Sequence, residues 1–420
     1  MGGQKSMRKQ RERIYAGLLC ICLMLSLVSA PVSAAETKQA EDTQQHAETA
    51  SARGGLSAPM PTAGGTAEVS TPADLTSALE NSTNGIIKLV GDITIDTTLK
   101  VNRTVTLDLN GWVLKYESST NQGRVIAVES GNTLTIEDSD TTTQHKFTPD
   151  ASGLWVLDET NGTETVSGGI ITGGTPADNG ASGSGVYVAP NAALTMNGGS
   201  IVGCRAGRSG RGGGVYIDSD TNSDGTYSTS TFTMNSGRII GCIADNGGGV
   251  AVASSCTFTM NNESVIRSCI ATYTGGGVYI VINLTHGPGV FTMEDGEISL
   301  CKADVRGGGV FNEGIFTMKD GVLKGCTAVR EGSTGGVRNY NQFIMSGGTI
   351  GAEGENDTSH VYNHSREFSV LTISGNAKIY TNVENEGRLE ADGGEIFGDV
   401  TNIRDSSIIT GTEGAAGSTK

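Results

Sequence analysis

Aromatic residues, proline and histidine are scarce in this 420-residue chain: aromatic residues make up 5%, and the counts are 8 prolines, 2 tryptophans and 5 histidines. Glycine is abundant by contrast, at 62 residues. This composition alone would favour disorder. A regular pattern of apolar residues, described below, argues against disorder for most of the chain.

Positively charged residues are also few: the chain has 29 Lys and Arg against 45 Asp and Glu, which gives a net charge of −16. Such a surface repels nucleic acid and anionic membranes, so the sequence predicts no nucleic-acid partner. An acidic surface suits a soluble extracellular protein that binds cations. The five histidines and the acidic residues do not recur in a clustered catalytic pattern, so an enzyme is less expected than a binding protein.

The chain has one long apolar run, "AGLLCICLMLSLVSA", preceded by five Lys and Arg and followed by "PVSAAE". This arrangement predicts a secretory signal peptide over residues 1–34, cleaved after Ala34, and hence a secreted or surface-exposed bacterial protein. Its loss removes five positive charges and one negative, changing −16 to about −20. A spanning helix is the alternative, but the run is shorter than the ~20 residues that a bilayer requires, and no second run follows.

Residues 35–68 hold almost no large apolar side chain and are predicted to be a disordered acidic spacer. The next stretch, "STPADLTSALENS", predicts a short capping helix, with Thr71 as its N-cap and Pro72 in its first turn. At the other end, residues 411–420, "GTEGAAGSTK", are predicted to be a frayed tail.

Between these ends, a short motif repeats. "LTM" or "FTM" begins at residues 194, 232, 258, 291 and 316, and looser copies begin at 343, 371 and 389. A period near 26 residues with variable insertions is typical of a solenoid, in which insertions lie in turns. Each copy splits into three short apolar pieces bounded by Gly or Asn, such as "FTM", "RIIGCIA" and "GGGVAV". Pieces of this length favour strands over helices.

Three strands per repeat indicate one coil of a parallel β-helix. We therefore expect an all-β fold over residues 69–410, a single-chain right-handed parallel β-helix of about eleven coils, about 50 Å long, behind the capping helix. Alternation along "FTM" predicts that the Phe and Met side chains stack inside the coils. The residues are Phe232, Phe258, Phe291, Phe316, Met234, Met260, Met293 and Met318.

Tandem "FTMxxGxIxxCxAxxxGGGVxx" coils behind a signal peptide resemble the pectin-lyase-like right-handed β-helix proteins of bacterial surfaces, in particular adhesin-like repeat proteins. The resemblance covers about three quarters of the chain. It implies the fold, whereas activity is not implied, because this fold hosts lyases, hydrolases, adhesins and tail spikes.

Cysteine recurs at one repeat position, with a sixth residue just before Phe258. Three interpretations remain open: a reduced interior column, at least one disulfide between neighbouring coils, and a metal site. The residues are Cys204, Cys242, Cys269, Cys301, Cys326 and Cys256.

The middle residue of the third strand forms a second column, predicted to point outward. Aromatic side chains spaced one coil apart could stack on sugar rings or bind a partner protein. The alternative is a column that stabilises its own sheet or lies beneath turns. The candidate ligand-binding residues are Tyr187, Tyr216, Tyr279, Phe311, Arg338 and Tyr362, with Ala251 interrupting them.

A candidate metal site lies in the insertion "DSDTNSDG", where Asp220, Asn222, Asp224 and Gly225 match the first half of a calcium loop. The position of the bidentate Glu holds Thr231, so the alternative is a plain polar turn. Ca²⁺ is the only cofactor that the sequence suggests.

The sequence therefore predicts a secreted or surface-associated, adhesin-like protein that recognises glycan or an extracellular or host protein through an outer face of the β-helix. A calcium-dependent polysaccharide lyase or hydrolase is the first alternative, and a structural surface spacer is the second. Neither a catalytic residue nor an oligomeric state is indicated.

Overall fold

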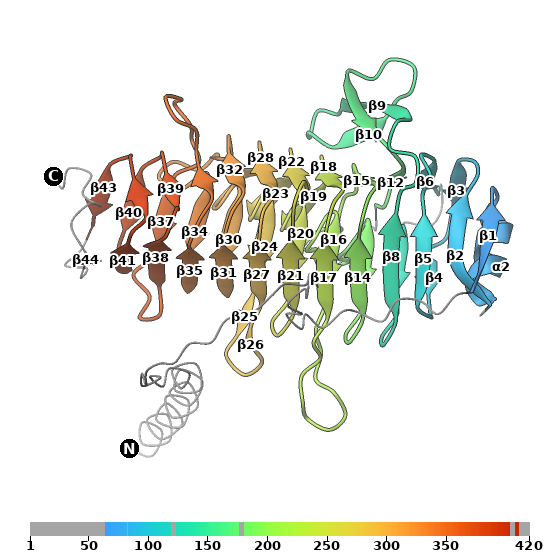
Figure 1. The fold of residues 1–420 in the computed structure, drawn as a ribbon, viewed down its shortest axis with the longest axis horizontal. Coiled ribbons are helices and arrows are strands. Elements are labelled where there is room, and N and C mark those ends of the chain that lie inside the picture. Colours follow the sequence, from blue (N-terminus) through green and yellow to red (C-terminus); the bar gives the residue numbers. More distant parts are fainter. Residues whose placement is uncertain (1–63, 82, 119–122, 176–179, 404–407, 411–420) are drawn as a thin grey trace, which may run out of the picture. The chain divides into compact units, whose positions relative to one another are not determined.

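A computed structural model describes residues 64–403, except 82, 119–122 and 176–179, together with 408–410. These residues form a right-handed parallel β-helix built on three long sheets (Figure 1). One strand from each sheet makes one coil, and the second and third sheets contain 11 strands each within the described ranges. The predicted fold and its eleven coils are confirmed.

Among the residues that the structure describes, the first sheet contains 13 parallel strands in this order: β1 (Gly65–Val69), β2 (Asn84–Leu89), β5 (Val105–Asp108), β8 (Thr133–Glu137), β14 (Ala193–Met196), β17 (Thr231–Met234), β21 (Thr257–Met260), β27 (Val290–Met293), β31 (Ile315–Met318), β35 (Gln342–Met345), β38 (Val370–Ser374), β41 (Arg388–Asp392) and β44 (Ile408–Thr410). The second sheet consists of β3 (Ile93–Ile95), β6 (Val113–Tyr116), β12 (Ile170–Thr172), β15 (Ser200–Val202), β18 (Arg238–Ile240), β22 (Val265–Arg267), β28 (Glu297–Ser299), β32 (Val322–Lys324), β36 (Thr349–Ile350), β39 (Lys378–Ile379) and β42 (Glu395–Ile396).

The third sheet consists of β4 (Leu99–Val101), β7 (Ile126–Val128), β13 (Val186–Val188), β16 (Val215–Ile217), β20 (Val250–Val252), β24 (Val278–Ile280), β30 (Val310–Asn312), β34 (Val337–Asn339), β37 (Val361–Asn363), β40 (Val383–Asn385) and β43 (Val400–Asn402). A four-stranded corner sheet, between the second and third strands of four coils, contains β19 (Ile243–Asn246), β23 (Ile270–Thr274), β29 (Lys302–Ala303) and β33 (Thr327–Ala328). A small hairpin of β25 (Ile282–Asn283) and β26 (Gly287–Pro288) projects from the coils.

The repeated Phe residues pair in register and stack inside the helix, as the sequence predicts. Ring centroids from Phe232 to Phe343 are 4.7–4.9 Å apart in successive coils, and the rings are nearly parallel. Each of these rings is fully buried, as are the Met side chains two residues later. Burying a large apolar side chain contributes about 1.5–3 kcal/mol, which offsets the ordering cost of a Gly-rich backbone.

The six cysteines are buried and unbridged, which agrees with the interior column among the three interpretations. Five of them follow the second strands of successive coils, and each thiol lies against backbone carbonyls, as in Cys301 Sγ to Ser299 O at 3.3 Å. Burial raises the pKa of the Cys242, Cys269 and Cys301 thiols, so they remain protonated.

The helix α2 (Pro72–Glu80) covers the N-terminal end of the coils, and Thr71 is its N-cap as predicted. The Thr71 hydroxyl accepts a hydrogen bond from the backbone N–H of Asp74 at 3.2 Å. The predicted spacer ends too late, however, because β1 already pairs with β2 from Gly65. The predicted signal peptide, most of the spacer and the tail lie outside the described residues.

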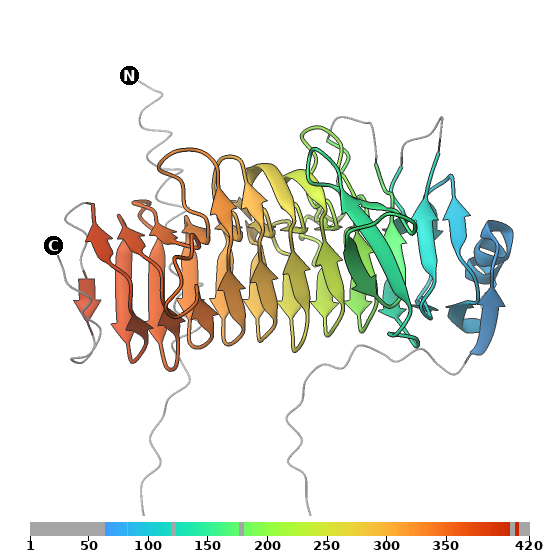
Figure 2. The same cartoon turned by 90° about the horizontal axis from the view of Figure 1, so that it is seen from above.

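An antiparallel flap of β9 (Gln144–Pro149), β10 (Trp155–Leu157) and β11 (Glu164–Ser167) is inserted before β12, where the sequence predicts only further coils (Figures 1 and 2). Phe147, Trp155 and Val166 from the flap form a second apolar core with outward residues of the second sheet. Those outward residues are Val113, Ile170, Val202 and Ile240. Val202 and Ile240 occupy one row of the second sheet, and the next residue in that row is Arg267, which is exposed.

Candidate functional site

The six candidate ligand-binding residues form one column on the third sheet, as the in-register pairs from Tyr187 to Tyr362 show. The prediction that they present an exposed aromatic face is wrong for five of them. Relative exposure is 8% for Tyr216, Tyr279 and Arg338, 7% for Tyr362 and 5% for Phe311. Only Tyr187 is half-buried.

A glycine triplet precedes β16, β20, β24 and β30, and it explains the burial of Tyr216, Tyr279 and Phe311. Gly275 has φ +69°, and a side chain added there would lie 3.0 Å from the Tyr279 Cβ, so the corner backbone folds directly over the column. Its neighbour Gly276 packs against the Lys302 carbonyl of the next coil, and Gly277 packs against interior side chains. The corner therefore requires three small residues and seals the column beneath it.

Within the column, neighbouring side chains pack against one another with tilted rings. Ring centroids are 6.1 Å apart between Tyr187 and Tyr216, and 5.7 Å apart between Tyr279 and Phe311. The guanidinium of Arg338 lies 4.0 Å from the centroid of the Tyr362 ring. These contacts stabilise the sheet itself, the alternative that the sequence analysis left open.

Two residues that the sequence analysis missed, Tyr340 and His364, extend this cluster. Their rings stack with centroids 4.2 Å apart, and the Tyr340 ring also packs against Phe311, with centroids 5.2 Å apart and a tilt of 44°. Burial lowers the pKa of His364, and the nearby cations Arg338 and Arg366 act in the same direction. Both residues follow the column residue by two positions in their own coils, which is the signal in the sequence that identifies them.

A polar cleft opens beside the half-buried end of the column. It has a volume of about 320 Å³ and is lined by Arg124, Gly180, Ser182, Tyr187, Ser209, Arg211, Tyr216 and Asp218. Two of the six candidate residues, Tyr187 and Tyr216, thus contribute to it. The other four candidate residues do not line it.

Asp218 organises the tyrosines of this cleft. The Tyr187 hydroxyl donates to its Oδ2 at 2.6 Å, and the Tyr216 hydroxyl donates to its Oδ1 at 3.0 Å. Desolvation raises the pKa of both tyrosines, and the charge of Asp218 adds to the effect. Both therefore remain neutral hydrogen-bond donors near neutral pH.

Two arginines frame the same cleft. Arg124 lies over the Tyr187 ring, 4.6 Å from its centroid, and its Nε donates to the Ser182 carbonyl at 2.6 Å. Arg211 occupies the place where Ala251 interrupts the aromatic column, 5.8 Å from the centroid of the Tyr279 ring. The cleft thus combines a ring face, hydroxyl groups and cationic side chains.

The candidate calcium loop forms a tight hairpin, with Thr221 bridged to Tyr227. Each candidate ligand has a local partner: Asp220 accepts from the Thr221 backbone N–H, Asp224 accepts from Thr226, and Asn222 accepts from Asn191. No group of three or more His, Cys, Asp or Glu suited to a metal ion occurs in the described ranges.

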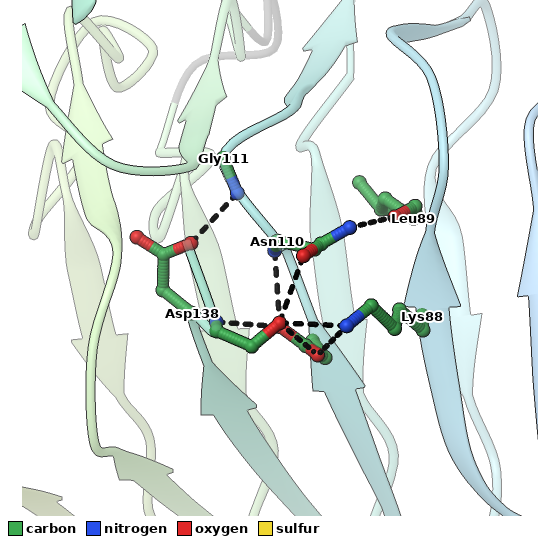
Figure 3. Close-up of polar contacts among 7 residues, drawn as sticks. Lys88, Leu89, Asn110, Gly111 and Asp138 are labelled. Carbon is green, nitrogen blue, oxygen red and sulfur yellow. Dashed lines mark hydrogen bonds and ion pairs between the residues drawn. The ribbon is translucent and has the colours of Figure 1, made fainter. Parts of the chain in front are cut away.

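A second polar cluster lies between the first coils (Figure 3). The Lys88 ammonium is 3.5 Å from the Asp108 carboxylate and donates to the Ser139 hydroxyl at 2.8 Å. Asp138 accepts from the backbone N–H of Gly111 at 2.8 Å, and burial raises its pKa although this hydrogen bond opposes the shift. These groups satisfy one another and the turns after β5 and β8, so the cluster supports the fold.

Glu294 and Lys319 of neighbouring coils form the ion pair that the repeat predicts, with the Lys319 Nζ 2.7 Å from the Glu294 Oε1. Asp295 and Asp320, at equivalent positions beside them, each accept the backbone N–H of the following glycine. Their carboxylates therefore complete turns.

No protein-family profile matches the chain, and neither the curated proteins nor the solved structures contain a significant match to it. In the part of the chain that the structure describes, no helix is long and apolar enough to span a membrane. Fold and site geometry are therefore the basis for any functional assignment.

Proposed function

We propose that this chain is a secreted or surface-associated binding protein that recognises glycan through the outer face of its third sheet. The observation that carries the proposal is the cleft at Tyr187, where a half-buried ring of the aromatic column lies beside hydrogen-bonding and charged groups. A half-buried aromatic face with fixed polar groups beside it is the usual composition of a sugar site.

The geometry supports a rigid site. Tyr187 is fixed on both sides, by Arg124 over its ring and by Tyr216 below it, and its hydroxyl is held by Asp218. All of these residues lie on or directly beside hydrogen-bonded strands, so little conformational entropy is lost when a ligand binds. The residue in greatest contact with a ligand is Tyr187.

A glycan-array screen of the full chain tests this proposal, with Tyr187→Ala as the site variant and Tyr380→Ala as the matched control. Tyr380 is a partly exposed tyrosine that stacks on Phe397, away from the cleft. We expect Tyr187→Ala to weaken glycan binding at least about 10-fold, because stacking and one hydrogen bond are lost. Equal binding by wild type and Tyr187→Ala would rule out this site.

A structural spacer is the second candidate, and the burial of five of the six column residues favours it. In that case the column would stabilise the third sheet and nothing more. A chain that binds no glycan and no extracellular protein on broad arrays, while remaining folded, would support the spacer.

A further inference from the structure

The cleft at Tyr187 differs in charge from the chain around it. The whole chain carries −16, yet the cleft is lined by two guanidinium groups, Arg124 and Arg211, and one carboxylate, Asp218. Two positive charges and one negative give the lining residues a net charge of +1, and the Asp245 carboxylate beside them accepts hydrogen bonds from the Ser209 backbone N–H at 2.8 Å and the Thr272 hydroxyl at 2.6 Å. The two Asp218 oxygens already accept the hydroxyls of Tyr187 and Tyr216, so the carboxylate is directed to the tyrosines.

The arginines are not neutralised by other carboxylates. Among the described residues, neither Arg124 nor Arg211 forms an ion pair, whereas Lys88, Lys319 and other cations of the chain do. Arg124 uses only its Nε, on the Ser182 carbonyl, and its remaining N–H groups have no protein partner within the described ranges. Guanidinium groups without a carboxylate partner are the donors that proteins use to bind oxyanions.

We propose that the cleft binds one singly charged oxyanion group of an acidic glycan, a carboxylate or a sulfate ester, between Arg124 and Arg211. This inference rests on the proposed glycan-binding function and specifies its ligand. The Tyr187 ring contacts the sugar that carries the anionic group, and Ser209 beside Arg211 adds a hydroxyl to the lining. Because the remainder of the surface is acidic, it repels polyanions, and attraction is confined to this cleft.

Three forms of one polymer test the inference: dextran sulfate, carboxymethyl dextran and unmodified dextran, immobilised and titrated with the full chain in biolayer interferometry. The backbone sugar is the same in all three, so differences in Kd report the anionic group. We expect a charged dextran to bind at least about 10-fold more tightly than dextran, as charge-assisted hydrogen bonds predict. The tighter of the two charged forms distinguishes sulfate from carboxylate.

Arg124→Gln and Arg211→Gln should each remove about 10-fold or more of this preference. The matched control is Arg238→Gln, which deletes the same charge from an exposed position on the second sheet. It should change the Kd less than about twofold, because charges beyond a Debye length are screened. Unchanged melting temperatures of the variants show that the loss is local.

Equal binding to all three dextrans would overturn the oxyanion inference and leave the proposed function standing. Equal losses in Arg238→Gln and the cleft variants would also overturn it, because attraction would then be a general field effect. A chain that binds neither these dextrans nor any glycan on the array would overturn the inference and the proposed function together.

Discussion

The third strands fill the same inward position in two different ways along the helix. In six successive coils the position holds apolar residues, namely Val101, Val128, Val188, Ile217, Val252 and Ile280. In the next five coils it holds asparagine: Asn312, Asn339, Asn363, Asn385 and Asn402. The change occurs between β24 and β30, where Ile280 pairs in register with Asn312.

The asparagines can be buried because they satisfy one another in series. Each Nδ2 donates to the Oδ1 of the next coil, at 2.7 Å from Asn312 to Asn339 and 2.8 Å from Asn339 to Asn363. The series continues at 2.9 and 3.0 Å to Asn385 and Asn402. At the junction, the Asn312 Oδ1 has no partner, because Ile280 offers no donor. A buried column of amides is therefore stable when the series is unbroken. The free-energy cost of an unpaired buried polar atom falls on the first residue of the series, Asn312.

The largest effect is expected from breaking the series in the middle. Asn363→Leu removes the acceptor of Asn339, the donor to the Asn385 Oδ1 and the donor to the Arg388 carbonyl. With buried polar groups left unpaired at about 1–3 kcal/mol each, we expect the free energy of unfolding to fall by about 3 kcal/mol. Urea denaturation followed by circular dichroism measures this change.

Asn312→Leu is the matched control at the end of the same series. It removes the Asn312 Oδ1 that already lacks a partner, and the Asn339 Oδ1 still accepts from the Asn341 backbone N–H. The Gln342 carbonyl loses the donor Asn312 Nδ2, so fewer buried groups lose partners than in Asn363→Leu, and the expected loss of unfolding free energy is about 1 kcal/mol. An equal fall in the free energy of unfolding for Asn312→Leu and Asn363→Leu would contradict the proposed series of hydrogen bonds.

A smaller effect, confined to alkaline pH, is expected from the outward column. Burial and the charge of Glu313 raise the pKa of Tyr279 in the folded chain. Its contribution to stability is therefore complete below the ordinary tyrosine pKa of about 10 and is lost as pH rises above it, by at most about 1.4 kcal/mol per pH unit. Between about pH 10 and 11, the free energy of unfolding should fall less steeply with pH in Tyr279→Phe than in the wild type. Parallel curves for Tyr279→Phe and wild type in urea titrations would show that Tyr279 is not the titrating group.

Features that repeat were predictable from the sequence, because a fixed period forces equivalent residues into register. The Phe column, the coil count and the Thr71 cap follow from this principle and from local capping chemistry. The burial of Tyr216 and Tyr279 was one of two alternatives that the sequence left open, because it depends on how the glycine corner folds back at positive φ, as at Gly275. Outward direction and exposure are different properties.

Features that do not repeat were missed. The flap occurs once, between β8 and β12, so no period marks it. Its signal in the sequence is indirect: the outward row that holds Val202 and Ile240 on the second sheet is apolar beneath the flap and continues with Arg267 in the next coil. The cleft likewise combines Arg124 and Arg211 from different coils, and neither belongs to a repeated position of the aromatic column.

In-register stacking of the coils is the claim on which the columns, the asparagine series and the cleft all depend, and a distance between spin labels tests it most directly. Thr195 on β14 and Thr372 on β38 face outward at equivalent positions, six strand steps apart in the first sheet. Steps of about 4.8 Å predict a backbone separation of about 29 Å, which double electron–electron resonance on cysteine-linked labels can measure after correction for the label arms. Moving the first label to Thr233, one coil closer, should shorten the distance by about 5 Å. A distance that does not shorten by one step, or a broad distribution without a preferred value, would contradict the stacked coils.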